Sequence, residues 1–158
     1  MFNFDSPFGS TIFCDDIRHE IGNKTSIIGI YSATIYVQEF PANIAKFGIV
    51  AYFNEPKRMA QDRKFPIQIQ VLLPNEEEHL FSVNLPPLSS EDIANLPTSG
   101  LSADPDIPSL ITLKAEFILS PLKIEKPGRI KVEVVYGADR IHIGTIAVNA
   151  APIPSPAT

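Results

Sequence analysis

Hydrophobic and polar residues alternate along much of this chain with a period of two. The clearest stretch is 129–136, where Ile, Val and Tyr occupy every second position and Arg, Lys and Glu lie between them. Residues 67–73 and 110–119 show a similar alternation. Successive side chains of a β-strand point to opposite faces of its sheet, so this spacing is typical of strands with one buried face. The pattern predicts a protein built mainly from β-strands.

The 15 prolines fall mostly at the ends of these β-rich stretches. A central strand excludes proline, because proline has no N–H to donate to a neighbouring strand. The stretches between the prolines predict about eight strands. They lie near residues 10–21, 25–38, 44–54, 66–74, 79–85, 110–119, 129–136 and 140–149. Strands in this number, separated by turn signals, favour a two-layer antiparallel β-sandwich of the immunoglobulin-like or C2-like kind over a closed barrel.

Three local signals add detail to this all-β prediction. Ser89 precedes two acidic residues and an apolar one, which predicts a capped helix of one or two turns. Residues 55–64 form a polar, charged crossover loop with room for another helical turn. The apolar positions change parity between Ile143 and Ile146, so we expect a β-bulge near Gly144.

The size and charge of the chain narrow the possible classes of function. A chain of 158 residues suits one domain, and we expect a sandwich over 1–149 followed by a flexible Pro- and Ala-rich tail over 150–158. The net charge is −5 and the 13 Lys and Arg residues are scattered, which argues against a nucleic-acid partner, because phosphate binding needs a concentrated basic face. No apolar run approaches the roughly 18 residues of a membrane span, and the N-terminus lacks the features of a signal peptide. We therefore expect a cytosolic protein with no membrane contact.

Cys14 is the only cysteine, so an internal disulfide is impossible. Its neighbours Ile12 and Phe13 predict an unreactive thiol that is partly or wholly buried.

The densest polar cluster lies at residues 14–24. On a helix, four of its side chains would share one face in an arrangement that suits a metal: Asp15, Asp16, His19 and Glu20. However, β-rich sequence flanks the cluster on both sides, and Gly22 followed by Asn23 suits a hairpin turn. We therefore predict two strands joined at that turn.

On a strand the cluster divides between two faces. Asp16, Arg18 and Glu20 point one way and form an acid–arginine–acid row, which is a candidate interaction surface. Asp15 and His19 point the other way, beside three apolar residues: Phe13, Ile17 and Ile21. If these two polar side chains are buried, each needs a partner, because an unpaired buried polar group costs about 1–3 kcal/mol. A hydrogen-bonded structural pair is favoured over a small binding or metal site near the sheet edge.

Two further acids suggest a test for calcium. Asp104 and Asp106 flank Pro105, and C2-like sandwiches bind calcium through aspartates on paired loops. Two acids are too few for about six to eight oxygen ligands, so Asp139 or backbone carbonyls would have to contribute. A plain turn around Pro105 is the favoured interpretation.

The sequence contains no signature of catalysis. It has no Gly-x-Ser-x-Gly elbow, no Walker phosphate loop and no His-Glu-x-x-His motif, and its three histidines are isolated from one another. We therefore expect no catalytic residues and no cofactor.

The hairpin segment resembles a family of small uncharacterised bacterial proteins, most clearly over residues 12–54. The matching features are the acid–Arg–acid strand, a Gly-containing turn with Lys, and an apolar strand that ends in Gly-x-Tyr. The positions that match in this chain are Asp16, Arg18, Glu20, Gly22, Lys24, Ile28, Gly29 and Tyr31, followed by Pro41. The family has no assigned activity, so the resemblance implies a bacterial or phage origin and no catalytic role.

Three functional hypotheses follow. The leading one is a non-enzymatic cytosolic β-sandwich that binds a protein partner or itself, through a sheet edge or the face of Asp16, Arg18 and Glu20. The second is a small-ligand or calcium-binding module that uses loop acids, or a sugar platform that uses the four tyrosines: Tyr31, Tyr36, Tyr52 and Tyr136. The third is an enzyme, which would require Asp15 and His19 to lie within hydrogen-bond reach in a pocket.

Overall fold

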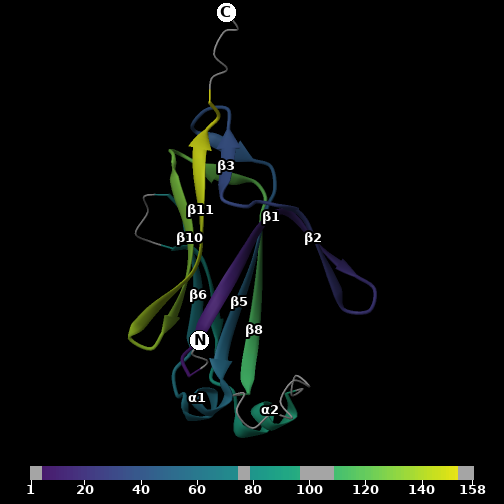
Figure 1. Ribbon diagram of the computed structural model, residues 1–158, viewed down its shortest axis with the longest axis vertical. Helices are drawn as coiled ribbons and strands as arrows, with labels where there is room; N and C mark the ends of the chain where they lie inside the picture. The colour runs from purple at the N-terminus through teal and green to yellow at the C-terminus, as the bar shows by residue number, and fades with distance from the viewer. Residues whose placement is uncertain (1–4, 75–78, 97–108, 153–158) are drawn as a thin grey trace, which may run out of the picture.

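A computed structural model describes residues 5–74, 79–96 and 109–152. In this part of the chain the strands form two packed sheets, and Figure 1 shows them running along the long axis of the molecule. The first sheet has the order β2 (Lys24–Ile30), β1 (Phe8–Glu20), β5 (Phe47–Pro56) and β8 (Leu110–Leu119). The second has the order β3 (Thr34–Val37), β11 (Asp139–Ala150), β10 (Gly128–Tyr136), β6 (Ile67–Leu72) and β7 (His79–Leu85). The predicted all-β sandwich is confirmed.

Neighbouring strands are antiparallel, apart from β3, which pairs in parallel with β11. Two short strands, β4 (Ala42–Ile44) and β9 (Leu122–Ile124), pair with each other separately. The main core lies between the sheets and is filled by side chains that are almost completely excluded from solvent, among them Phe47, Phe53, Ile69, Ile130 and Ile146. This core accounts for the alternation in the sequence, because every second residue of the central strands enters it.

One predicted strand is wrong. Residues 25–38 form two strands, β2 and β3, which belong to different sheets. Gly29 adopts φ +67° near the end of β2, an irregularity that glycine tolerates, and after Ile30 the chain crosses from one sheet to the other. The short strands β4 and β9 were not expected either, because three residues carry too little alternation to indicate a strand.

The local predictions are confirmed. The helix α2 (Ser90–Asn95) begins at Ser89, whose hydroxyl accepts a hydrogen bond from the Asp92 amide while the Asp92 carboxylate accepts one from the Ser89 amide. The Ser89 hydroxyl also donates to the Asp92 carboxylate at 2.6 Å, and this bond, followed by the one from the Ser89 amide, holds the pKa of Asp92 below its ordinary value. The register of β10 and β11 shifts after the pair Val132 and Gly144, which places the bulge beside that glycine.

The helix α1 (Lys57–Asp62) occupies the predicted crossover loop, close to α2 at one end of the sandwich (Figure 1). At the opposite end, β11 runs through Ala150, and the Ala151 amide still donates to the Val37 carbonyl. The rest of the predicted tail, from residue 153, lies outside the described residues. Within the described residues, no helix has the length and apolarity to cross a membrane.

A buried ion pair lies at the end of the sandwich where α1 is located. The side chains of Glu55 and Arg63 are almost fully excluded from solvent, and Arg63 Nε donates to Glu55 Oε1 at 3.0 Å. The Tyr136 hydroxyl donates to the same oxygen at 2.8 Å, and Arg63 Nη1 donates to the Phe65 carbonyl at 2.7 Å. Burial, followed by the bond to Glu55, raises the pKa of Tyr136. Among the described residues, Glu55 Oε2 and Arg63 Nη2 have no hydrogen-bond partner, so the two charges are incompletely compensated.

This incomplete compensation leads to a prediction about stability. Replacing Arg63 by Met is expected to lower the free energy of unfolding by about 3–5 kcal/mol, because the Glu55 carboxylate then stays buried without its cation. The double variant Glu55→Gln with Arg63→Met removes both charges and keeps an acceptor for Tyr136, so it should recover most of the loss. Urea denaturation of the three proteins measures the difference, and a double variant as unstable as the single one would contradict this account of the pair.

Candidate functional site

The hairpin of β1 and β2 is the part of the fold that projects from the sandwich (Figure 1). Strand β1 pairs with β5 only from Phe8 to Cys14, and from Cys14 to Glu20 it pairs with β2 alone. Gly22 and Asn23 turn the hairpin with positive φ angles, as their types predict. The outer half of β1 therefore has β2 as its neighbour on one side and no longer pairs with β5 on the other.

The alternation of core-facing and outward-facing side chains along β1 is interrupted at Cys14, where pairing with β5 ends. Phe13 enters the main core, whereas Cys14 and Ile17 both pack against Val50 on the outer face of the sheet. Gly48 leaves room for this contact, because a Cβ there would lie 2.8 Å from Cys14 Sγ and 3.0 Å from an Ile17 side-chain carbon. The predicted burial of the Cys14 thiol is confirmed, and this burial raises its pKa.

Two polar contacts hold the hairpin over β8. His19 Nε2 lies 3.0 Å from Glu116 Oε2, and Lys114 Nζ donates to Thr25 Oγ1 at 3.1 Å. Lys114 also forms an ion pair with Glu116. Together with the apolar contacts around Cys14, they fix the direction in which the hairpin leaves the sandwich.

Asp15 and His19, considered as a possible buried polar pair, both lie at the surface. Asp15 is exposed, and the side chain of His19 is 69% exposed. Asp15 accepts a hydrogen bond from the Tyr31 hydroxyl, whereas His19 faces Glu116, so their recorded partners lie on different elements. Ile21, expected beside them on an apolar face, is 99% exposed at the turn. Burial would have required neighbouring strands on both sides of this half of β1, whereas beyond Cys14 it pairs with β2 alone.

The row of Asp16, Arg18 and Glu20 lies on the hairpin. One of its residues, Asp16, also forms an ion pair with a residue outside the hairpin. Asp16 forms ion pairs with Arg18, at 2.9 Å, and with Lys46. The hydrogen bond from Lys46 has the largest effect, followed by the one from Arg18, and together they lower the pKa of Asp16 to about 2. The sequence showed the acid and the arginine, but nothing in it indicated that Lys46, from the loop before β5, reaches the same carboxylate.

The calcium hypothesis gains no support within the described residues. They contain no group of three or more His, Cys, Asp or Glu side chains that is suited to a metal ion. Asp139 is exposed at the start of β11, and the other two acids of the predicted set, Asp104 and Asp106, lie outside the described residues.

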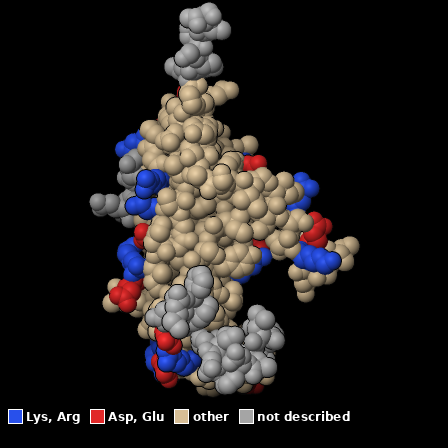
Figure 2. Space-filling view, in the orientation of Figure 1, with Lys and Arg blue, Asp and Glu red and all other residues tan. Residues whose placement is uncertain are grey.

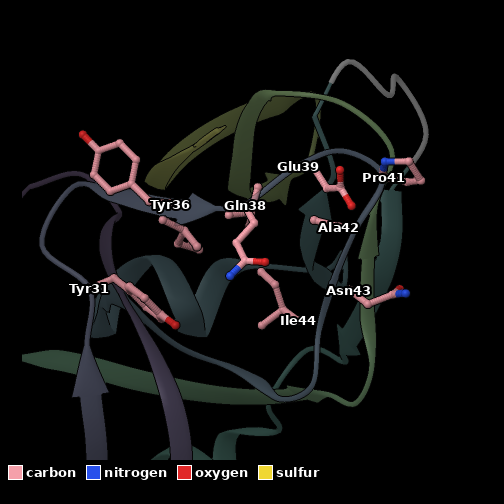
Figure 3. A pocket seen from close by; sticks show the side chains of 10 residues that line it. Tyr31, Tyr36, Gln38, Glu39, Pro41, Ala42, Asn43 and Ile44 are labelled. Carbon is pink, nitrogen blue, oxygen red and sulfur yellow. The ribbon is translucent and has the colours of Figure 1, made fainter. Parts of the chain in front are cut away.

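A concave pocket lies beside the base of the hairpin, between β3 and β4 (Figure 3). Its volume is about 390 Å³, and a single segment of chain lines it: Tyr31, Ile35, Tyr36, Val37, Gln38, Glu39, Pro41, Ala42, Asn43 and Ile44. Tyr31 forms a wall, because its ring packs against Phe47 with centroids 6.0 Å apart and its hydroxyl is held by Asp15. Burial, followed by the bond to Asp15, raises the pKa of Tyr31 to about 12.

Of the four tyrosines considered as stacking surfaces for a sugar, two line this pocket. Tyr31 and Tyr36 line the same pocket, and Figure 3 shows them at one side of it. Tyr136 is buried against Phe53 and Phe65, and Tyr52 packs beside the cluster of Cys14 and Val50. Sequence reasoning missed the pocket, because its lining residues form no motif.

We expect the contact between Asp15 and Tyr31 at the base of the hairpin to require glycine at position 29. A Cβ at this position would lie 2.0 Å from Asp15 Oδ2, and φ is +67°. Gly29→Ala should therefore lower the free energy of unfolding by about 1–3 kcal/mol and lower the pKa of Tyr31 by displacing Asp15. Gly22→Ala is the matched control, since φ there is +81° but nothing lies within 4 Å of its Cβ. Thermal denaturation and NMR titration of Tyr31 measure both effects, and equal effects of the two substitutions would rule out the clash with Asp15.

The ion pairs of Asp16 predict its titration. Because the pKa in the folded protein lies below the ordinary value of about 3.9, the stabilising effect of this carboxylate is present above that pH and is lost as the pH falls toward 2. Carboxyl NMR should give a pKa of about 2, and Lys46→Gln should raise it further than Arg18→Gln does. The reverse order, or an ordinary pKa in the unsubstituted protein, would show that Lys46 does not reach the carboxylate in solution.

The comparisons with known proteins place the chain in a family without assigning it an activity. No curated protein and no solved structure matches it. A model of a family of unknown function, DUF6941, matches residues 9–149, which include the hairpin, the pocket and both sheets. The chain therefore belongs to this family of unknown function.

Proposed function

We propose that this protein is a non-enzymatic, cytosolic interaction module and that the hairpin of β1 and β2 is its contact surface for a protein partner or a second copy of the chain. We further propose that the acid–arginine–acid hairpin is a shared feature of the family and that the family is bacterial. The observation that carries the functional proposal is the exposure of isoleucine along the hairpin: Ile21 is 99% exposed, Ile30 62% and Ile28 41%.

These isoleucines adjoin the charged row. Ile28 lies directly opposite Asp16 across the hairpin, so the two side chains share a face. An apolar side chain on an exposed face gains free energy when a partner covers it, and flanking charges favour one partner and orientation over others. Figure 2 shows side chains of both charges on the projecting hairpin, separated by a broad uncharged surface from those along the opposite edge of the molecule.

The outer strand of the hairpin is also an edge. Within the described residues, β2 has β1 on one side and no strand on the other. The unpaired side of an edge strand presents N–H and C=O groups to which another strand can bind. Because His19 and Lys114 already anchor the hairpin to β8, little conformational freedom has to be lost when a partner binds.

The experiment compares two exposed apolar surfaces, of which the hairpin position Ile28 is matched in exposure by Leu80 on β7. Ile21→Ser combined with Ile28→Ser removes the apolar contacts of the hairpin, and Leu80→Ser, at the far edge strand β7, is the control because Leu80 is also 41% exposed. Sedimentation over a concentration series tests self-association, and affinity capture from the native lysate tests a partner. We expect the hairpin variant to weaken the complex at least about tenfold, equivalent to about 1.4 kcal/mol, and the control to leave it unchanged. A monomer with no captured partner, or equal loss in both variants, would contradict the proposal.

A further inference from the structure

The pocket between β3 and β4 follows the backbone of its strands. Its lining includes five consecutive residues, 35–39, and three consecutive residues of β4, 42–44. Side chains along a strand alternate between two faces, so a pocket on one face would contact only every second residue. A pocket that contacts every residue in turn lies along the edge of the strand.

The edge of β3 that faces away from β11 has unpaired backbone groups. The carbonyls of Ala33 and Val37 accept hydrogen bonds from the amides of Ala147 and Ala151. Successive residues of a strand direct their N–H and C=O groups to alternate sides, so those of Thr34 and Tyr36 point away from β11. Within the described chain no other strand pairs with β3, which is the first strand of its sheet.

We propose that this pocket binds an extended peptide segment of a protein partner, which adds to β3 as a further strand and carries a Lys or Arg side chain. Main-chain hydrogen bonds to an exposed strand edge are an established mode of peptide recognition, in which flanking pockets select side chains. The partly buried apolar side chains of the lining, Val37 and Ile44, cover the aliphatic portion of the segment.

The charges around the pocket indicate which peptide segments it favours. Glu39 is the one charged residue of the lining, and the hydroxyl of the Tyr31 wall is bonded to a second carboxylate, Asp15. The nearest cation along the paired strands, Lys123 opposite Asn43, is already in an ion pair with Glu125 at 2.6 Å. A positively charged side chain is therefore complementary to the pocket, and an acidic segment is disfavoured. This site is distinct from the hairpin surface and does not rest on the function proposed for it.

Two substitutions at one position separate backbone recognition from side-chain recognition. Tyr36→Pro removes the N–H that points from the free edge and leaves the bonds to β11 in place, and proline is tolerated in edge strands. Tyr36→Ala removes the exposed ring and keeps the N–H. Strand addition predicts at least a tenfold loss of affinity with Tyr36→Pro and less than a threefold loss with Tyr36→Ala. Stacking of a sugar on the ring predicts the opposite order.

The probe is a phage library of random dodecapeptides selected on the full-length protein, with binding of enriched peptides measured by fluorescence anisotropy. We expect sequences with Lys or Arg in an otherwise apolar and β-branched stretch, and an affinity that falls several-fold with Glu39→Lys. Thr34→Pro, which removes the other outward N–H, replaces Tyr36→Pro if thermal denaturation shows that the latter has lost its fold. No enriched peptide, binding that both proline variants leave unchanged, or a preference for acidic peptides would overturn the proposal. The hairpin substitutions Ile21→Ser and Ile28→Ser should leave peptide binding intact, so failure of either proposal is recognised separately.

Discussion

The hydrogen bond between Asp15 and Tyr31 fixes the base of the hairpin of β1 and β2. Asp15 follows the last residue of β1 that pairs with β5, and Tyr31 follows the last residue of β2. On one side of this bond the hairpin projects and exposes its isoleucines. On the other side the ring of Tyr31 is fixed against Phe47 and becomes a wall of the pocket. Gly29 makes the bond possible, because any larger residue would occupy the position of the carboxylate. Both candidate binding surfaces thus depend on one small contact at the edge of the sandwich.

Most of the sandwich was predictable because its strands obey one simple rule. Strands β6, β8 and β10 each have one face in the core, so their sequences alternate, and the parity change in β11 revealed its bulge. Ser89 indicated the start of α2, because its capping hydrogen bonds reach only as far as Asp92. The alternation of buried and exposed positions fails as a guide where one strand packs against different surfaces along its length. Between Phe13 and Ile17, β1 passes from the main core to an outer cluster, and nothing in the local sequence distinguishes that passage from a regular strand.

The candidate site was less predictable because its contacts come from distant parts of the chain. The row of Asp16, Arg18 and Glu20 was visible in the sequence, but Lys46 and Glu116 reach the hairpin only in the folded protein. Glu55 and Arg63 appeared to belong to a solvated loop, although they are among the most buried polar residues. The residues that line the pocket form no motif, and the direction of an N–H group cannot be read from residue types. Tyr36 accordingly gave no sign that its main chain, as well as its ring, faces open space.

The separate apolar cluster around Cys14 has a consequence for the motions of the molecule. Cys14, Ile17 and Val50, with three partly buried neighbours, bind the hairpin to the sandwich without contributing to the main core. Regions with few buried contacts open locally at free energies below that of global unfolding. Although His19 and Lys114 also link the hairpin to β8, β5 no longer pairs with β1 beyond Cys14, so we expect the hairpin to open before the central strands and its amide hydrogens to exchange faster than theirs. A partner that requires the docked hairpin then stabilises this attachment, and its binding slows that exchange.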